Sequence, residues 1–269
     1  MKKDYFNKDI TPLLNKKLYL FDMDGTIYID NTLFCGTKKV LDLIDKSGGK
    51  YVFITNNSSK SIDDYIIKLS RLGLVVNKDN FYTSTLASIT LLRDKFKDGL
   101  IYAQGTSSFI NELKLGGLNI TEEFSNDIKC VLVGFDLELT TKKLNTTCYV
   151  LTKLSVPYYA TNPDWVCPVD FGFVPDCGSM CFSIEKATGK TPIFIGKPQA
   201  TMINAVMESF GVNREDTVVF GDRIYTDIAS GKNAGVDTVL VLSGESNLTD
   251  YYNSQIKPDY LLNSIDDLI

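Results

Sequence analysis

Two short acidic motifs could bind a metal ion. Asp22 and Asp24 lie in FDMDGT, and Asp222 and Asp227 lie in GDRIYTD. Carboxylates held close together repel one another, and a hard divalent cation with oxygen ligands relieves that repulsion. Mg²⁺ commonly uses one or two protein carboxylates, several waters and a phosphate oxygen of its substrate. The motifs therefore predict a magnesium and phosphate site.

Three further residues could bind the phosphate at this site. Lys197, in Gly196-Lys197-Pro198, would supply a point charge, and the Thr55 hydroxyl with nearby backbone N–H groups would be neutral donors. Gly25 gives the backbone room for close approach after Asp24. Alone, a DxDG motif is commonly a turn and a single lysine is usually solvated. The complete set, with its members at expected strand ends, favours a functional site.

Composition excludes several other kinds of chemistry. The 269 residues include no histidine, so Ser-His-Asp triads, Cys-His pairs and His-ligated zinc sites are ruled out. The net charge of −5 argues against binding to nucleic acid or to a membrane surface. Six cysteines without a C-x-x-C pair indicate reduced thiols. Residues 1–17 lack the apolar run of a signal peptide, and we expect a soluble cytoplasmic protein.

The acidic motifs follow apolar runs that are typical of buried parallel strands. Helical patterns separate these runs, and this alternation predicts a parallel sheet with helices on both faces. In such a sheet the carboxyl ends of the strands converge, which would bring the polar residues together. We expect core strands at residues 18–21, 51–54, 193–195, 217–220, 239–242 and 260–262.

The middle of the chain repeats the alternation as a separate block. It contains expected strands at 100–103, 130–133 and 157–160, with helical patterns between them. An irregular stretch at 161–178, with the only tryptophan, is typical of a functional loop. We therefore predict two domains. Residues 1–80 and 187–269 would form the core, and residues 81–186 an inserted α/β domain.

Four motifs together resemble those of the haloacid dehalogenase superfamily of aspartate-dependent phosphatases. They are DMDGT, Thr55-Asn56-Asn57, Gly196-Lys197-Pro198 and GDRIYTD. The insertion between the second and third motifs resembles a C2-type cap. FITNNSSKS and ATNPD resemble the NagD-like, para-nitrophenylphosphatase branch, subfamily IIA. The resemblance implies a Rossmann-like, doubly wound parallel-sheet core with an inserted α/β cap domain.

The resemblance also implies catalytic roles for the matched residues. Asp22 would be the nucleophile that forms an aspartyl-phosphate, and Asp24 would be the general acid and then the general base. Thr55 would bind a phosphoryl oxygen, and Lys197 would neutralise charge on the nucleophile and the phosphoryl group. Splitting hydrolysis into two displacements explains how a chain without histidine could carry it out.

Metal and substrate contacts are implied in the same way. Asp222 would bind Mg²⁺ beside Asp22 and the backbone carbonyl of Asp24, and Asp227 would support it from nearby. Further substrate or phosphate contacts are expected from Gly25, Asn56, Asn57, Asn162 and Asp164. Whether Trp165, Phe171 or Cys177 touches the substrate is left open.

The leading hypothesis is a Mg²⁺-dependent phosphatase for small phosphate monoesters, such as nucleotides, sugar phosphates or pyridoxal phosphate. Its partner would be a small phosphorylated metabolite, not a nucleic acid or a membrane. One alternative is a phosphotransferase that uses the same aspartyl-phosphate. Another is a non-catalytic regulatory protein of this fold that binds a phosphate ligand. The physiological substrate and the assembly into a homo-oligomer are left open.

Overall fold

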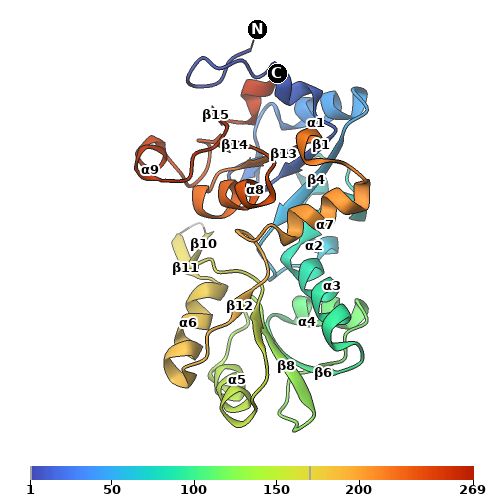
Figure 1. Ribbon diagram of the computed structural model, residues 1–269, viewed down its shortest axis with the longest axis vertical. Coiled ribbons are helices and arrows are strands. Elements are labelled where there is room, and N and C mark those ends of the chain that lie inside the picture. Colours follow the sequence, from blue (N-terminus) through green and yellow to red (C-terminus); the bar gives the residue numbers. More distant parts are fainter. Residues whose placement is uncertain (1, 170) are drawn as a thin grey trace. The chain divides into compact units, whose positions relative to one another are not determined.

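The computed structural model describes residues 2–169 and 171–269, which form two compact units (Figure 1). Unit 1 contains the segment that ends at Thr55, together with Ile66–Tyr82 and Lys197–Ile269. Unit 2 contains Asn56–Tyr65 and Thr83–Gly196. The division into a core of residues 1–80 and 187–269 and an inserted domain of residues 81–186 stays a prediction from the sequence.

The first sheet has six strands in the order β15-β14-β13-β1-β4-β5. β1 pairs in parallel with β4 on one side and with β13 on the other. All four residues of β1 are buried, which explains its uninterrupted apolar sequence. The predicted α/β class with a parallel core sheet is confirmed. The strands are β1 (Leu18–Phe21), β4 (Lys50–Thr55), β5 (Phe81–Thr83), β13 (Thr217–Gly221), β14 (Asp237–Val241) and β15 (Tyr260–Leu262).

Amphipathic helices connect these strands. Val40, Leu41 and Ile44 form the buried face of α1, which ends before Gly48, a residue with a φ of +78°. α7 and α8 pack against each other, and α8 contacts β14 (Figure 1). The helices are α1 (Thr37–Lys46), α2 (Ile62–Arg71), α7 (Thr201–Phe210), α8 (Ala229–Ala234) and α9 (Leu248–Asn253). Shorter elements are η1 (Thr11–Asn15), η2 (Lys78–Asn80), η3 (Arg214–Asp216), η4 (Ile224–Ile228), η5 (Ile265–Leu268), β2 (Tyr28–Ile29) and β3 (Thr32–Leu33).

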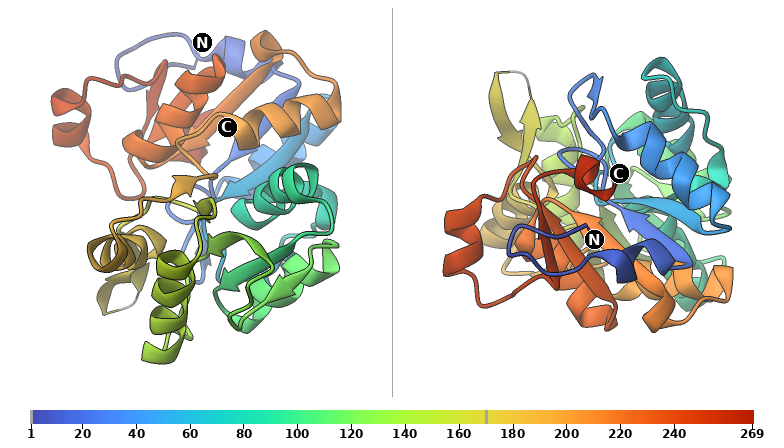
Figure 2. Two further views of the ribbon diagram at one scale, coloured as in Figure 1. Left: turned by 60° about the horizontal axis from the view of Figure 1, so that its bottom comes forward. Right: turned by 90° about the horizontal axis from the view of Figure 1, so that it is seen from above.

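Unit 2 is built on a second sheet, with the order β12-β9-β8-β6-β7 and parallel pairing throughout. Figure 2 draws most of this unit in green and yellow. Three of its helices begin after threonines, Thr83, Thr106 and Thr140, whose hydroxyls accept backbone N–H groups of the first turn. The strands are β6 (Leu100–Gln104), β7 (Ile120–Thr121), β8 (Ile128–Val133), β9 (Tyr158–Ala160) and β12 (Ile193–Phe194). The helices are α3 (Ser84–Phe96), α4 (Ser107–Leu115), α5 (Thr141–Lys153) and α6 (Cys177–Thr188).

Two local expectations from the sequence are wrong. The strand expected in the core at 193–195 is β12, which pairs with β9 in the second sheet. The stretch at 161–178, expected to be irregular, contains an antiparallel hairpin of β10 (Val166–Val169) and β11 (Gly172–Pro175). Pairing between the two strands supplies the backbone hydrogen bonds that a loop of this composition would otherwise leave to water.

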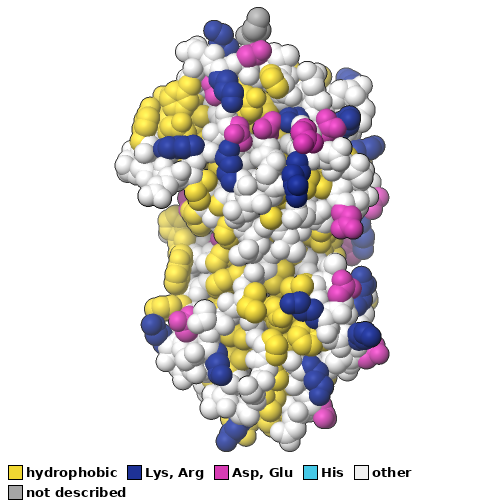
Figure 3. All heavy atoms as spheres, in the orientation of Figure 1, with side chains coloured by type: hydrophobic (Ala, Val, Ile, Leu, Met, Phe, Trp, Pro, Cys, Tyr) yellow, Lys and Arg dark blue, Asp and Glu magenta, His cyan; other side chains and the backbone are white. Residues whose placement is uncertain are grey.

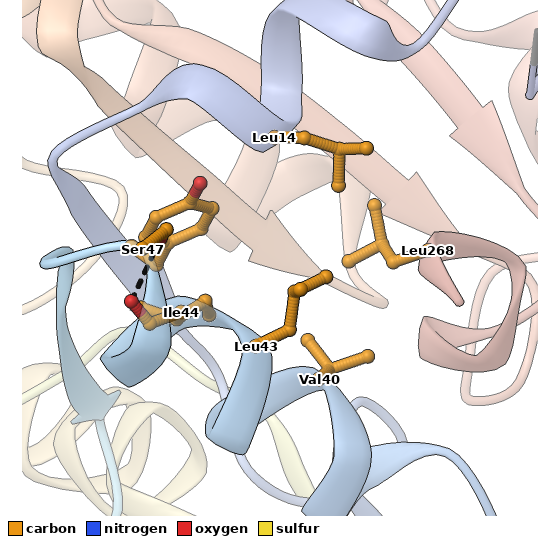
Figure 4. Close-up of a pocket in the computed structure, with 7 residues that line it drawn as sticks. Leu14, Val40, Leu43, Ile44, Ser47 and Leu268 are labelled. Carbon is orange, nitrogen blue, oxygen red and sulfur yellow. Dashed lines mark hydrogen bonds between the residues drawn. The ribbon is translucent and has the colours of Figure 1, made fainter.

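A small hollow in unit 1 lies between η1, α1 and η5 and is drawn in Figure 4. Its volume is about 10 Å³, and Leu14, Val40, Leu43 and Leu268 point into it. Ser47, also on its rim, donates its hydroxyl to the Ile44 carbonyl at 2.8 Å. A space this small and apolar is a packing defect and not a ligand site.

The surface shows no separation of charge on the face drawn in Figure 3, where acidic and basic side chains are interspersed. Among the helices of the described residues, none combines the length and the apolar character needed to cross a bilayer.

Candidate active site

The first sheet brings the acidic motifs together at the carboxyl ends of three adjacent strands. Asp22 directly follows β1, Thr55 is the last residue of β4, and Asp222 directly follows β13. Because β1 lies between β4 and β13 and all three run in parallel, these residues share one edge of the sheet. Asp227 reaches the same edge from η4, the turn that precedes α8.

Lys197 joins two of the aspartates. Its Nζ lies 2.6 Å from Asp22 Oδ1 and 2.5 Å from Asp227 Oδ1, and it donates to the Ile54 carbonyl at 3.2 Å. The lysine side chain is almost completely buried. Burial by itself lowers the pKa of Lys197, but the charges of Asp22 and Asp227 outweigh it and raise that pKa. The ammonium group therefore stays charged at neutral pH.

Three carboxylates lie close together at this site. Asp22, Asp222 and Asp227 each place an oxygen within 4.8 Å of the others. Burial raises the pKa of Asp22 to about 7, although Lys197 opposes the shift. Burial, together with the charges of Asp22 and Asp227, also raises the pKa of Asp222 well above its usual range. With all three ionised, more negative than positive charge would be held out of water, a situation that a cation would relieve.

Asp222 tests whether a metal ion fits here. Its Oδ2 accepts the backbone N–H of Glu245 at 2.7 Å. Its Oδ1 is buried and, within residues 2–169 and 171–269, has no hydrogen-bond partner. A buried carboxylate oxygen without a donor, next to two further carboxylates, suits a hard cation with oxygen ligands. The residues present therefore fit Mg²⁺.

Two glycines allow the backbone to lie against Asp222. Gly25 has a φ of +80°, and a Cβ there would lie 2.5 Å from Asp222 Oδ2. At Gly244 a Cβ would lie 2.1 Å from the same oxygen. Any side chain at either position would displace the carboxylate. The structure thus places Gly25 beside Asp222, where it gives space to the candidate metal site.

Asp24 is not among the three clustered carboxylates, and about half of its side chain is exposed. Its Oδ2 accepts a hydrogen bond from the Tyr28 hydroxyl at 3.0 Å. Its Oδ1 lies 3.6 Å from Lys68 Nζ. Neither contact was anticipated from the sequence, although Tyr28 follows Asp24 by only four residues in the same turn.

A second group missed from the sequence supports Asp222. The Arg223 Nε lies 2.7 Å from Glu245 Oε2, and the Tyr225 hydroxyl donates to Glu245 Oε1 at 2.9 Å. Glu245 is thereby anchored in the position from which its N–H reaches Asp222. Arg223 and Tyr225 lie inside the GDRIYTD motif, but nothing in the sequence links them to a residue after β14.

The remaining expected site residues lie in unit 2. Asp164 Oδ2 accepts from Asn56 Nδ2 at 3.0 Å and from Asn162 Nδ2 at 2.9 Å. Asn162 Nδ2 also donates to Asp176 Oδ1 at 3.1 Å. All four side chains are buried, so the structure brings Asn56, Asn162 and Asp164 together in one hydrogen-bonded network. Asn57 lies beside it and accepts from the N–H and hydroxyl of Ser59.

Trp165, Phe171 and Cys177, whose contact with a substrate the sequence does not decide, differ in how far they are exposed. Trp165 is 56% exposed and packs edge-on against the ring of Phe182, whereas Phe171 is 83% exposed. Cys177 is fully buried, and burial raises the pKa of its thiol well above the usual value. Cys177 therefore packs in the interior of unit 2, out of reach of solvent.

Known proteins resemble this chain over nearly its whole length. The family model described as haloacid dehalogenase-like hydrolase matches residues 19–119, and a model described as HAD-hydrolase-like matches residues 194–268. An acid sugar phosphatase of Staphylococcus saprophyticus is 30% identical over 255 residues, which cover 95% of this chain and 97% of the relative. The chain belongs to the haloacid dehalogenase-like hydrolases.

Solved structures place it within that family. The 4-nitrophenylphosphatase of Thermotoga maritima superposes with a TM-score of 0.90 at 36% identity, covering 96% of this chain and 97% of the other. NagD of E. coli K-12 superposes with a TM-score of 0.84 at 31% identity, covering 94% of this chain and 98% of the NagD chain. The expected NagD-like branch is confirmed, and this haloacid dehalogenase-like hydrolase is a phosphoric monoester hydrolase.

Proposed function

We propose that this haloacid dehalogenase-like hydrolase is a Mg²⁺-dependent phosphatase that cleaves small phosphate monoesters through an aspartyl-phosphate on Asp22. One observation carries the proposal. The buried Lys197 ammonium lies 2.6 Å from Asp22 Oδ1, beside a cluster of carboxylates that holds a donor-free oxygen of Asp222. A nucleophilic carboxylate that must approach an anionic phosphate needs positive charge at this point.

Asp22, Asp222 and the backbone carbonyl of Asp24 would hold the ion, with Asp227 supporting the cluster through Lys197. When bound, Mg²⁺ supplies charge neutralisation for the nucleophile and the phosphoryl group. Lys197 adds a fixed positive charge next to Asp22. Gly25 and Gly244 have no side chain of their own, which leaves the space that the Asp222 carboxylate occupies.

The covalent chemistry uses two carboxylates in sequence. A carboxylate oxygen of Asp22 attacks phosphorus, and the bond from phosphorus to the leaving oxygen breaks while Asp24 gives that oxygen a proton. The ionised Asp24 then takes a proton from a water molecule, whose oxygen attacks the aspartyl-phosphate and releases Asp22 and inorganic phosphate. The Thr55 hydroxyl, at the end of β4, would donate to a phosphoryl oxygen.

For the substrate, we propose small monoesters with sugar phosphates as the first class to test. The acid sugar phosphatase of S. saprophyticus and the 4-nitrophenylphosphatase of T. maritima support this choice. Asn56, Asn162 and Asp164 would order a substrate-binding segment within unit 2 through their buried network.

Hydrolysis of 4-nitrophenyl phosphate by the purified protein tests the proposal. We expect phosphate release in Mg²⁺, loss of activity in EDTA with recovery on adding Mg²⁺, and loss of at least about a thousandfold in kcat for Asp22→Asn. Asp42→Asn, an exposed aspartate on α1, is the matched control and should keep full activity.

Three outcomes would contradict the proposal. Turnover that survives Asp22→Asn would exclude the aspartyl-phosphate. Phosphate transferred to an added alcohol in place of release to water would indicate a phosphotransferase. Tight binding of inorganic phosphate without turnover of any monoester in Mg²⁺ would indicate a regulatory binding protein.

A further inference from the structure

Asp24 is contacted by two side chains of unit 1 that the proposed mechanism does not use. The Tyr28 hydroxyl donates to Asp24 Oδ2 at 3.0 Å, and Lys68 Nζ lies 3.6 Å from Asp24 Oδ1. Lys68 Nζ also lies 3.8 Å from the centroid of the Tyr28 ring. The carboxylate, the phenol and the ammonium group therefore contact one another in a closed triangle.

The surrounding elements hold this triangle in place. Tyr28 begins β2 and is fully buried, and its backbone carbonyl accepts the Gly25 N–H at 2.8 Å. A buried ring anchored in this way cannot turn away from Asp24. Lys68 lies on α2, next to the buried Leu69, and only 20% of its side chain is exposed. Its ammonium group is attracted to the face of the Tyr28 ring as well as to the carboxylate.

We propose that Tyr28 and Lys68 are positioning residues for Asp24, which keep its carboxyl group oriented for proton transfer to the leaving oxygen. This inference rests on the proposed function. About half of the Asp24 side chain is exposed, so without these contacts its carboxyl group could rotate into solvent. Tyr28 restrains one carboxyl oxygen through its hydrogen bond, and the Lys68 ammonium group restrains the other through their ion pair.

A positioning role predicts a dependence on the leaving group. The value of kcat/KM includes the steps up to formation of the aspartyl-phosphate, in which Asp24 donates its proton. Phenolate is a poorer leaving group than 4-nitrophenolate and needs that proton more. Loss of Asp24 orientation should therefore slow phenyl phosphate more than 4-nitrophenyl phosphate. A variant that is merely less well folded would slow both by the same factor.

The test compares Lys68→Met and Tyr28→Phe with the wild type on these two substrates. We expect kcat/KM to fall about tenfold or more on phenyl phosphate and only about twofold on 4-nitrophenyl phosphate. Lys68→Arg, which keeps the charge over the ring, should recover part of the loss. Adding Lys68→Met to Asp24→Asn should change kcat/KM less than about twofold, because both act through one group.

Lys46→Met, at an exposed lysine in the last turn of α1, is the matched control and should behave as wild type. Equal losses on the two substrates, or a full effect of Lys68→Met in the Asp24→Asn background, would overturn the inference. Equal losses with weaker inhibition by inorganic phosphate would instead make Lys68 a direct phosphate ligand. A wild type without phosphatase activity overturns the proposed function, and the inference with it, whereas an active wild type with unaffected variants overturns the inference alone.

Discussion

At the scale of single residues, charge balance around Lys197 dominates the site. One buried ammonium group faces Asp22 and Asp227, and Asp222 completes the cluster. Taking these charges out of water is costly, and their mutual attraction offsets the cost only while every member is present. The arrangement is therefore poor at simply stabilising the fold but well suited to holding a nucleophile beside positive charge.

Replacing Lys197 tests this balance. We expect Lys197→Met to abolish turnover and to lower the free energy of unfolding of the EDTA-treated protein by about 3 kcal/mol at neutral pH, since it leaves buried carboxylates without their counter-charge. Lys232→Met removes a partly exposed ion pair with Asp259, 2.6 Å long, and should cost less than about 1 kcal/mol. Urea unfolding measures the free energy of unfolding of both variants. Equal decreases for the two would show that burial of the Lys197 ion pairs has no energetic consequence.

At the scale of elements, the turn after β1 and the segment after β14 determine where Asp222 can lie. Gly25 and Gly244 both lie close to Oδ2 of this carboxylate, and the Glu245 N–H donates to the same oxygen. Arg223 and Tyr225 anchor Glu245 in turn. Backbone segments thus shape the candidate metal site as much as its carboxylates do.

Two glycines with almost the same φ angle allow this crowding to be distinguished from the strain of a positive φ. Gly25 has a φ of +80° and Gly48 a φ of +78°, but nothing lies within 4 Å of a Cβ added at Gly48. Gly48→Ala should therefore cost about 1 kcal/mol of stability and leave Mg²⁺ binding unchanged. Gly25→Ala should in addition weaken Mg²⁺ binding at least about tenfold, because it displaces Asp222. Calorimetric titration measures the Mg²⁺ affinity of both variants. Equal affinities would show that a Cβ at Gly25 does not displace Asp222.

At the scale of the whole molecule, the candidate site would couple Mg²⁺ binding and the protonation of Asp22 to the stability of the fold. In the folded metal-free chain Asp22 keeps its proton up to about pH 7, whereas its usual pKa is 3.8. The folded state therefore binds more protons than the unfolded state between these values. It follows that Asp22 makes the metal-free protein less stable as the pH rises from about 4 to about 7. A bound cation would remove this penalty.

Metal binding should accordingly depend on pH. Mg²⁺ must displace the proton of Asp22 below about pH 7, so its apparent affinity should fall as the pH decreases, by up to about tenfold per unit for each proton displaced. The increase in melting temperature caused by Mg²⁺ should be larger at about pH 8 than at about pH 5.5. Asp22→Asn has no such proton and should show a shallower dependence. A wild-type affinity that is the same at both pH values would contradict the assignment.

Local patterns in the sequence determined much of the architecture. Uninterrupted apolar runs such as Leu18–Phe21 marked buried parallel strands, and the polar residues just after them marked the edge at which a site would form. The motif residues Asp22, Asp222, Asp227 and Lys197 do meet there. These features were readable because strand burial and motif spacing are local properties of the chain.

Only the tertiary structure decided which distant groups touch. It paired Lys197 with both Asp22 and Asp227, placed Lys68 and Tyr28 on Asp24, and tied Glu245 to Asp222. It also showed that β12 belongs to the second sheet and not to the first, although the short apolar sequence of this strand suits either sheet equally well. Residue types along a chain specify what chemistry is available, but side-chain contacts between segments far apart in sequence depend on packing that no local pattern encodes.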